Sequence, residues 1–164
     1  MSRYMQFSSH RHPKVTVDGQ PSVGGMDAAV ARDIAHATHR YSRTRSGEFV
    51  IEHVARVAAH VPREAQATAW LHDVLEQHPP MLDELRAQGL SMTEEQALAL
   101  LTRADDEAYE VYALRVAHAP GPAGRLARIV KLADLDDNMA RPWVSGDPPF
   151  AWARRHVDGA VRVD

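Results

Sequence analysis

The sequence predicts an all-α fold, a single-domain helical bundle, and three observations support this. Apolar residues recur at helical spacing along most of the chain, as in Val50, Val54, Val57 and Val61. No stretch has the alternation of a strand longer than a few residues, and no internal repeat is present. With 164 residues, 45% of them hydrophobic, the chain is long enough for one domain with a sizeable core.

The expected elements follow one another with short interruptions. Residues 1–25 are polar and rich in Ser, His, Pro and Gly, so we expect a flexible N-terminal segment ahead of a helical domain over 26–164. Pro62 suits a first helical turn, Gly89 suits a helix end, and Thr93 with Gln96 forms a capping-box pattern. We expect loops at 43–48 and 141–149, and helices at 27–41, 50–61, 62–77, 81–89, 94–103, 106–118, 124–139 and 150–163.

Composition excludes several classes of function. Lys and Arg number 19 against 22 Asp and Glu, and no stretch combines basic and aromatic residues, so binding to a nucleic-acid duplex is disfavoured. The absence of cysteine excludes disulfides, thiolate zinc sites and cysteine nucleophiles. No signal-peptide core and no membrane-spanning apolar run is present, so we expect a cytoplasmic protein without a membrane partner. The oligomeric state stays open.

Four ionisable side chains are expected at inward-facing positions on three helices. His53 lies on the stripe of Val50 and Val57, and His72 and Asp73 follow a segment without charge. Asp134 lies at the edge of another apolar stripe. Two imidazoles and two carboxylates suit a divalent ion such as Mn, Fe or Mg. Four protein ligands on an ion that prefers six would leave two positions for water or substrate, as in a catalytic metal site.

Each of these ligands also has an ordinary structural explanation. A His-Asp pair is common by chance, a histidine on an apolar stripe is usually a hydrogen-bonded core residue, and an aspartate near such a stripe often caps a helix. Their order favours the metal site: a histidine, then His-Asp about twenty residues later, then an aspartate within "VKLADLDDN" some sixty residues on.

This order resembles that of the HD-domain metal-dependent phosphohydrolases, and most of all their RelA/SpoT-type branch with its small single-domain alarmone hydrolases. The resemblance covers about residues 27–140. Its carriers are "RSGEFVIEHVARVA" (45–58), "AWLHDVLEQ" (69–77), "MLDELRAQG" (81–89) and "IVKLADLDDNM" (129–139). It implies an HD-type helical domain that uses Mn²⁺ to remove pyrophosphate from the 3′ position of (p)ppGpp, a small-molecule nucleotide.

The same resemblance implies roles for individual residues. It makes His53, His72, Asp73 and Asp134 the ligands of the ion. It makes Glu76 the group that positions or activates the attacking water. It also implies that Asn138 lines the nucleotide site, because this residue matches an asparagine of the branch in that role.

The chain departs from the branch at the position after Glu76, where Gln77 replaces the second acid of the proposed catalytic pair. Glutamine can orient water but cannot take its proton. The segment before the first ligand also differs, with Tyr41, Ser42 and Thr44 at the positions of the branch's G-Q and Arg. These departures keep two alternatives open: a nucleoside monophosphate or deoxynucleotide phosphatase, and a non-catalytic nucleotide-binding HD module.

Other residues have weaker signals. Arg45 and Ser46 lie in a glycine loop that could hold a substrate phosphate. Lys131, three residues before Asp134, is most simply one half of a helix-surface pair. We expect packing roles for Trp70, Trp143 and Trp152. We expect surface or supporting positions for His36, His39, His60, His78, His118 and His156.

Overall fold

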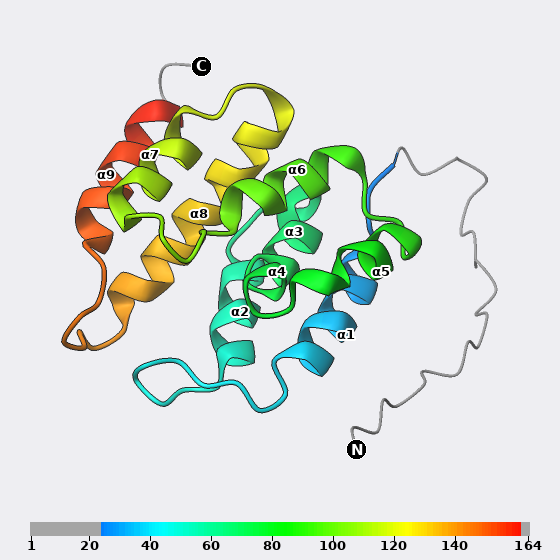
Figure 1. Cartoon of the computed structure of the whole chain (residues 1–164), viewed down its shortest axis with the longest axis horizontal. Helices are drawn as coiled ribbons and strands as arrows, with labels where there is room; N and C mark the ends of the chain where they lie inside the picture. The colour runs from blue at the N-terminus through cyan, green and yellow to red at the C-terminus, as the bar shows by residue number, and fades with distance from the viewer. Residues whose placement is uncertain (1–23, 162–164) are drawn as a thin grey trace.

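The computed structural model describes residues 24–161, and this part of the chain is mostly helical, with no β-strand (Figure 1). The all-α class is therefore confirmed. The expectation for residues 1–25 lies outside the described residues, apart from Gly24 and Gly25. The elements are α1 (Ala28–Thr38), α2 (Val50–Ala59), η1 (Arg63–Ala65), α3 (Gln66–Leu71), α4 (Val74–Gln77), η2 (Pro79–Met81), α5 (Leu82–Ala87), α6 (Met92–Leu101), α7 (Tyr109–His118), α8 (Gly121–Ala140) and α9 (Phe150–Val161).

Helix α8, with 20 residues, is the central packing element. It contacts α2, α3, α6, α7 and α9. Figure 1 shows α7 and α9 towards one end of the molecule and α1 and α5 towards the other, with α8 and α2 between them. One core cluster joins Val57 of α2, Ala69 of α3, Leu101 of α6, Val116 of α7 and Val130 of α8. Polar residues on the same helices are thereby brought close to one another.

The segment predicted as one helix over 62–77 is divided. It forms η1, α3 and α4, and the break falls at His72 and Asp73. His72 keeps helical angles, but Asp73 has φ −98° and ψ −6°, in the bridge region where the helical hydrogen-bond ladder does not continue. The expected burial of this segment is confirmed, because most of α3 is buried. The two predicted ligands therefore lie in a turn between helices.

The capping-box prediction was wrong in its register. Ser91 is the N-cap of α6, and its hydroxyl accepts from Glu94 N while the Glu94 carboxylate accepts from Ser91 N. Thr93 therefore lies inside the first turn. The same carboxylate accepts from Met26 N at 3.0 Å, a contact that ties the chain before α1 to α6. Gly89 behaves as predicted, with φ +101° just after the C-cap of α5.

The remaining differences lie at element ends and on the surface. Helix α7 begins at Tyr109, three residues later than predicted, and α9 forms despite Gly159. Trp70 and Trp152 pack against core clusters as expected. Trp143 does not, because it is 74% exposed in the loop after α8. None of the described helices is both long enough and apolar enough to cross a membrane.

Candidate metal centre and its cavity

Two imidazoles and one carboxylate meet inside the protein. His53 comes from α2, His72 follows α3, and Asp134 comes from α8. One ligand atom from each lies within 4.8 Å of the others, and the three residues are only 4%, 5% and 7% exposed. Buried groups of this kind are costly unless they are paired or bind a metal. Three of the four predicted ligands thus form a group that could hold a metal ion.

Both imidazoles direct Nε2 towards this meeting point. His53 Nδ1 lies 2.6 Å from Asp137 Oδ2, while its Nε2 lies 3.2 Å from Asp134 Oδ1. His72 Nδ1 lies 2.7 Å from Ala69 O, an atom that can only accept, so Nδ1 must carry a proton. In the neutral ring, Nε2 then holds a lone pair. His72 Nε2 is buried and has no hydrogen-bond partner among the described residues, as expected for a ligand atom without its ion.

Asp73, the fourth predicted ligand, lies at the edge of this group. Its Oδ1 is 3.3 Å from His72 Nε2, and its side chain is partly exposed. It is not part of the set of ligand atoms within 4.8 Å of one another. The turn between α3 and α4 therefore places His72 in the interior and Asp73 on its more open side.

Asp134 is held by two neighbours on its own helix. Lys131 Nζ donates to Oδ2 at 2.7 Å, and Asn138 Nδ2 donates to Oδ1 at 2.6 Å. Burial would raise the pKa of Asp134. The positive charge of Lys131 and the hydrogen bond with His53 outweigh burial and keep this pKa well below its usual range. The prediction that Lys131 pairs at the helix surface was wrong about its location, because the residue is buried. Asn138 contacts the candidate ligand directly.

Asp137 is a residue of this centre that was not singled out from the sequence. Its carboxylate accepts from His53 and also from Arg56, at 2.6 Å to Arg56 Nε. Arg56 in turn pairs with Glu48, in the loop before α2. Carboxylates that orient a ligating histidine in this way are common around protein metal sites. A signal was present in the sequence, since Asp137 lies three residues after Asp134 and therefore on the same helix face.

The two carboxylates control the charge of His53. Burial alone would lower its pKa, but the hydrogen bonds with Asp134 and Asp137 outweigh burial and raise the pKa to about 10. Without an ion, His53 is therefore protonated at neutral pH and donates from both ring nitrogens. Binding of a metal through Nε2 would have to displace that proton.

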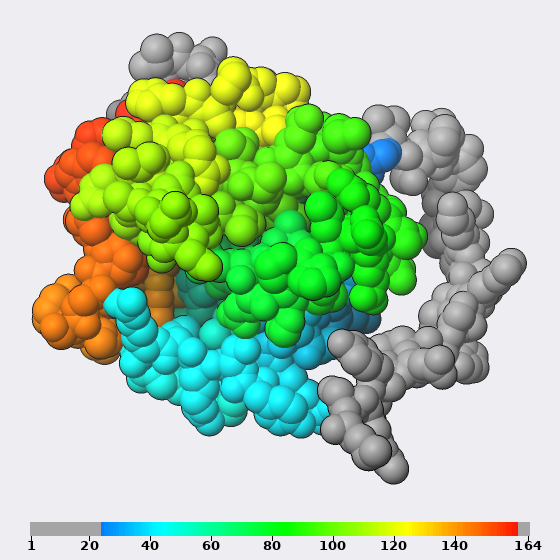
Figure 2. Space-filling model, in the orientation of Figure 1, coloured from blue at the N-terminus to red at the C-terminus, as the bar shows by residue number. Residues whose placement is uncertain are grey.

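The three buried residues open onto a cavity of about 370 Å³, which we call the site cavity. Figure 2 shows the face hollowed between the loop after α1, the region of α4, the α6–α7 loop and the loop after α8. The lining of the site cavity combines the candidate ligands with other basic and acidic side chains. The residues that line it are Arg43, Thr44, Arg45, Val50, His53, His72, Asp73, Glu76, Gln77, Leu101, Arg103, Tyr109, Tyr112, Lys131, Asp134, Asn138, Arg141, Asp147, Pro148 and Phe150.

The predicted substrate-binding loop is only partly at the cavity. Arg45 lines it and donates a hydrogen bond to Gly146 O, which joins the loop after α1 to the loop after α8. Ser46 is exposed, lies outside the lining, and has its hydroxyl 2.9 Å from that of Thr44. Arg45 and Asn138 are therefore placed to meet a ligand in the cavity, and Ser46 is not among the residues that line it.

The predicted catalytic pair, Glu76 and Gln77, ends α4 and lines the cavity. Loss of water around Glu76 raises its pKa, and the charge of Asp73 raises it further, while Arg103 and Lys131 partly oppose this. Glu76 is therefore a better proton acceptor than an ordinary glutamate. Gln77 contacts the end of α1 and the loop that follows it.

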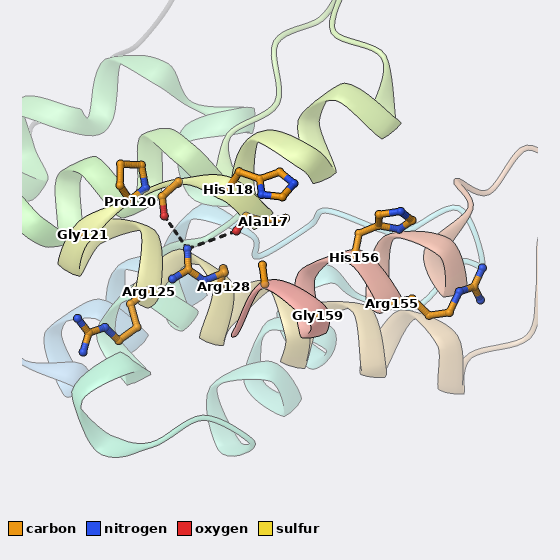
Figure 3. A pocket seen from close by; sticks show the side chains of 11 residues that line it. Ala117, His118, Pro120, Gly121, Arg125, Arg128, Arg155, His156 and Gly159 are labelled. Carbon is orange, nitrogen blue, oxygen red and sulfur yellow. Dashed lines mark hydrogen bonds between the residues drawn. The ribbon is translucent and has the colours of Figure 1, made fainter. Parts of the chain in front are cut away.

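A second cavity, of about 690 Å³, lies between the α7–α8 turn and α9 and is lined in part by three arginines and two histidines (Figure 3). We call it the arginine cavity; its charged and imidazole side chains are His118, Arg125, Arg128, Arg155 and His156. Arg125 and Arg155 extend in opposite directions, while Arg128 Nη1 donates to the backbone carbonyls of Ala117 and Ala119. None of these described side chains belongs to a group of potential metal ligands.

No protein-family model and no curated protein sequence matches this chain. The buried group of His53, His72 and Asp134 and the site cavity are therefore the features that indicate a function.

Proposed function

We propose that this protein is a metal-dependent phosphohydrolase of the HD type, acting on a phosphate or pyrophosphate group of a nucleotide. The observation that carries the proposal is the buried group of His53, His72 and Asp134 at the base of a cavity with several basic side chains. The sequence departs from the RelA/SpoT-type pattern at Gln77 and in the segment before His53, so the pattern does not identify the nucleotide. The first substrate to test is (p)ppGpp, with loss of its 3′-pyrophosphate.

The donor set fits a divalent ion. His72 Nε2 is a buried atom without a hydrogen bond among the described residues, and His53 and Asp134 present a nitrogen and an oxygen to the same point. Asp73 would complete the set from the edge. Nitrogen and oxygen donors suit Mn²⁺, Fe²⁺ or Mg²⁺, and the resemblance in the sequence favours Mn²⁺. Such an ion supplies Lewis-acid polarisation of a phosphoryl group and makes water easier to deprotonate.

The side chains of the cavity supply the other requirements of hydrolysis. Glu76, with its raised pKa, can accept a proton from water that attacks in the cavity. Arg45 and Arg103 line the same space and would orient the phosphate oxygens. Lys131 is committed to Asp134, so its charge holds the carboxylate in place and contributes to the positive potential of the site.

The test is a hydrolysis assay on protein freed of metal and then supplied with Mn²⁺. The panel holds (p)ppGpp, nucleoside monophosphates and deoxynucleotides, and the assay separates released pyrophosphate from orthophosphate. Pyrophosphate from (p)ppGpp supports the alarmone substrate, and orthophosphate from monophosphates identifies the phosphatase alternative. Binding without turnover identifies a non-catalytic nucleotide-binding module. Neither binding nor turnover across the panel would overturn the proposal.

A matched pair of variants links any activity to the centre. His72→Ala removes a candidate ligand and should abolish Mn²⁺-dependent turnover. His118→Ala removes an exposed histidine of the arginine cavity and should leave turnover unchanged. Equal loss in both variants would place the activity elsewhere.

A further inference from the structure

The side-chain amide of Gln77 is held by two residues outside the metal group. Its Oε1 lies 3.2 Å from His39 Nδ1, and it accepts a hydrogen bond from Ser42 Oγ at 3.0 Å. His39 is the C-cap of α1 and is fully buried, while Ser42 lies in the loop that follows. Two contacts on one oxygen fix the rotation of the amide at the rim of the site cavity.

The proton on His39 decides which end of the amide faces the cavity. Burial lowers the pKa of His39, so the ring is neutral and carries one proton. His39 Nε2 is buried without a hydrogen-bond partner among the described residues. If the proton were on Nε2, it would be an orphaned buried N–H, a rarer defect in proteins than an unsatisfied acceptor. The proton therefore belongs on Nδ1, where Gln77 Oε1 accepts it.

With Oε1 turned towards His39 and Ser42, the amide nitrogen is the free end. It makes no hydrogen bond with the other described residues, although Gln77 lines the cavity. We propose that Gln77 serves the site as a fixed hydrogen-bond donor, which binds a phosphate oxygen of the substrate instead of accepting a hydrogen bond from the attacking water. This inference rests on the proposed function, because it assumes an anionic phosphate ligand in the site cavity.

A donor role would also explain why Gln77 replaces the second acid of the RelA/SpoT-type pair. An acid at this position could only accept hydrogen bonds once ionised, and it would repel a phosphate. An amide held by its oxygen can only donate. The substitution therefore changes the position from one that handles protons to one that binds negative charge, while Glu76 stays as the acid or base of the pair.

The tautomer can be measured without any ligand or metal. Nitrogen-15 NMR of the full chain, with the His39 ring assigned through a His39→Gln variant, reports which ring nitrogen carries the proton. We expect the proton on Nδ1. A proton on Nε2 would overturn the inference, because Gln77 would then have to donate to His39 and present its oxygen to the cavity. The proposed function would be unaffected by that result.

Binding of inorganic pyrophosphate to the Mn²⁺-loaded protein, measured by calorimetry, tests the donor itself. Gln77→Glu keeps an oxygen for His39 and Ser42 but replaces the donor by an acceptor, and it should weaken binding by about tenfold or more. Gln77→Met removes the donor without adding charge and should also weaken binding, by a smaller factor. Gln88→Glu adds the same charge at an exposed position outside the cavity lining and should leave binding unchanged.

Failure of the donor role of Gln77 can be distinguished from failure of the proposed function. If the wild-type protein binds pyrophosphate and hydrolyses a nucleotide while Gln77→Glu and Gln77→Met match it, the donor role is wrong and the proposed function stands. The same conclusion follows if Gln77→Glu increases turnover, as a better acceptor for water would. If the wild-type protein neither binds pyrophosphate nor hydrolyses any nucleotide, the proposed function falls, and this inference falls with it.

Discussion

The site cavity and the arginine cavity hold similar kinds of side chain, yet they use them differently. In the site cavity, His53, His72 and Asp134 converge within 4.8 Å in the interior. In the arginine cavity, His118 and His156 are exposed, and Arg125 and Arg155 extend in opposite directions. The arginine cavity is the larger of the two, at about 690 Å³ against 370 Å³. Convergence of buried ligand atoms, and not cavity volume, is therefore what marks the candidate centre.

The largest expected difference between the cavities is in metal content. Replacement of His72 by Ala should reduce bound Mn²⁺ from about one equivalent to a trace, because it removes a buried donor nitrogen. His118→Ala should retain the wild-type content, measured by mass spectrometry of the metal after desalting. A wild-type protein without a divalent ion under Mn²⁺-replete conditions would contradict the metal centre itself.

The next difference is in stability. Asp134→Ala leaves the buried ammonium of Lys131 without its carboxylate and should lower the free energy of unfolding of the metal-free protein by about 3–5 kcal/mol. Arg155→Ala removes an exposed cation of the arginine cavity and should change it by no more than about 0.5 kcal/mol. Both changes in the free energy of unfolding would be measured by urea denaturation. The double variant Lys131→Met/Asp134→Leu should recover most of the loss; similar costs for Asp134→Ala and Arg155→Ala would mean that Lys131 finds another partner.

The smallest effect concerns the support of His53. Asp137→Asn keeps the shape of the side chain but removes its charge, and should weaken Mn²⁺ binding by about 10–100-fold without abolishing it. The neighbouring Asp136 is exposed and pairs with Arg154, so Asp136→Asn is the matched control and should bind as the wild type does. Competition with a chelator gives both affinities. Equal affinities in the two variants would show that Asp137 does not orient the ligand.

The fold class and the buried ligands could be predicted from the sequence because both follow local spacing. His53 lies on a stripe of valines and Asp134 lies beside another apolar stripe, and both residues are buried. The register of the capping box could not be decided in this way, since Ser91 with Glu94 and Thr93 with Gln96 both fit the pattern. The distant Met26 N also bonds to Glu94, and no local pattern predicts that contact.

The supporting residues of the centre were harder to predict. A lysine three residues before an aspartate has the same spacing on an exposed and on a buried helix face, so the position of Lys131 depended on the packing of α8. No Gly or Pro in the stretch "AWLHDVLEQ" indicates the helix break at Asp73. The contact of His39 with Gln77 joins residues that are 38 positions apart, and sequence spacing carries no information about it.

The packing of α8 has a consequence for the whole chain. This helix holds Asp134 and also packs against α2, α3, α6, α7 and α9, while His53 and His72 belong to segments that pack against it. An ion held by all three residues would bind only the folded chain, and so it would draw the unfolding equilibrium towards the native state. By mass action, a concentration one hundred times Kd stabilises a protein by about 2.7 kcal/mol. The supply of the ion would thus shift the balance between folded and unfolded molecules, in addition to any reaction they perform.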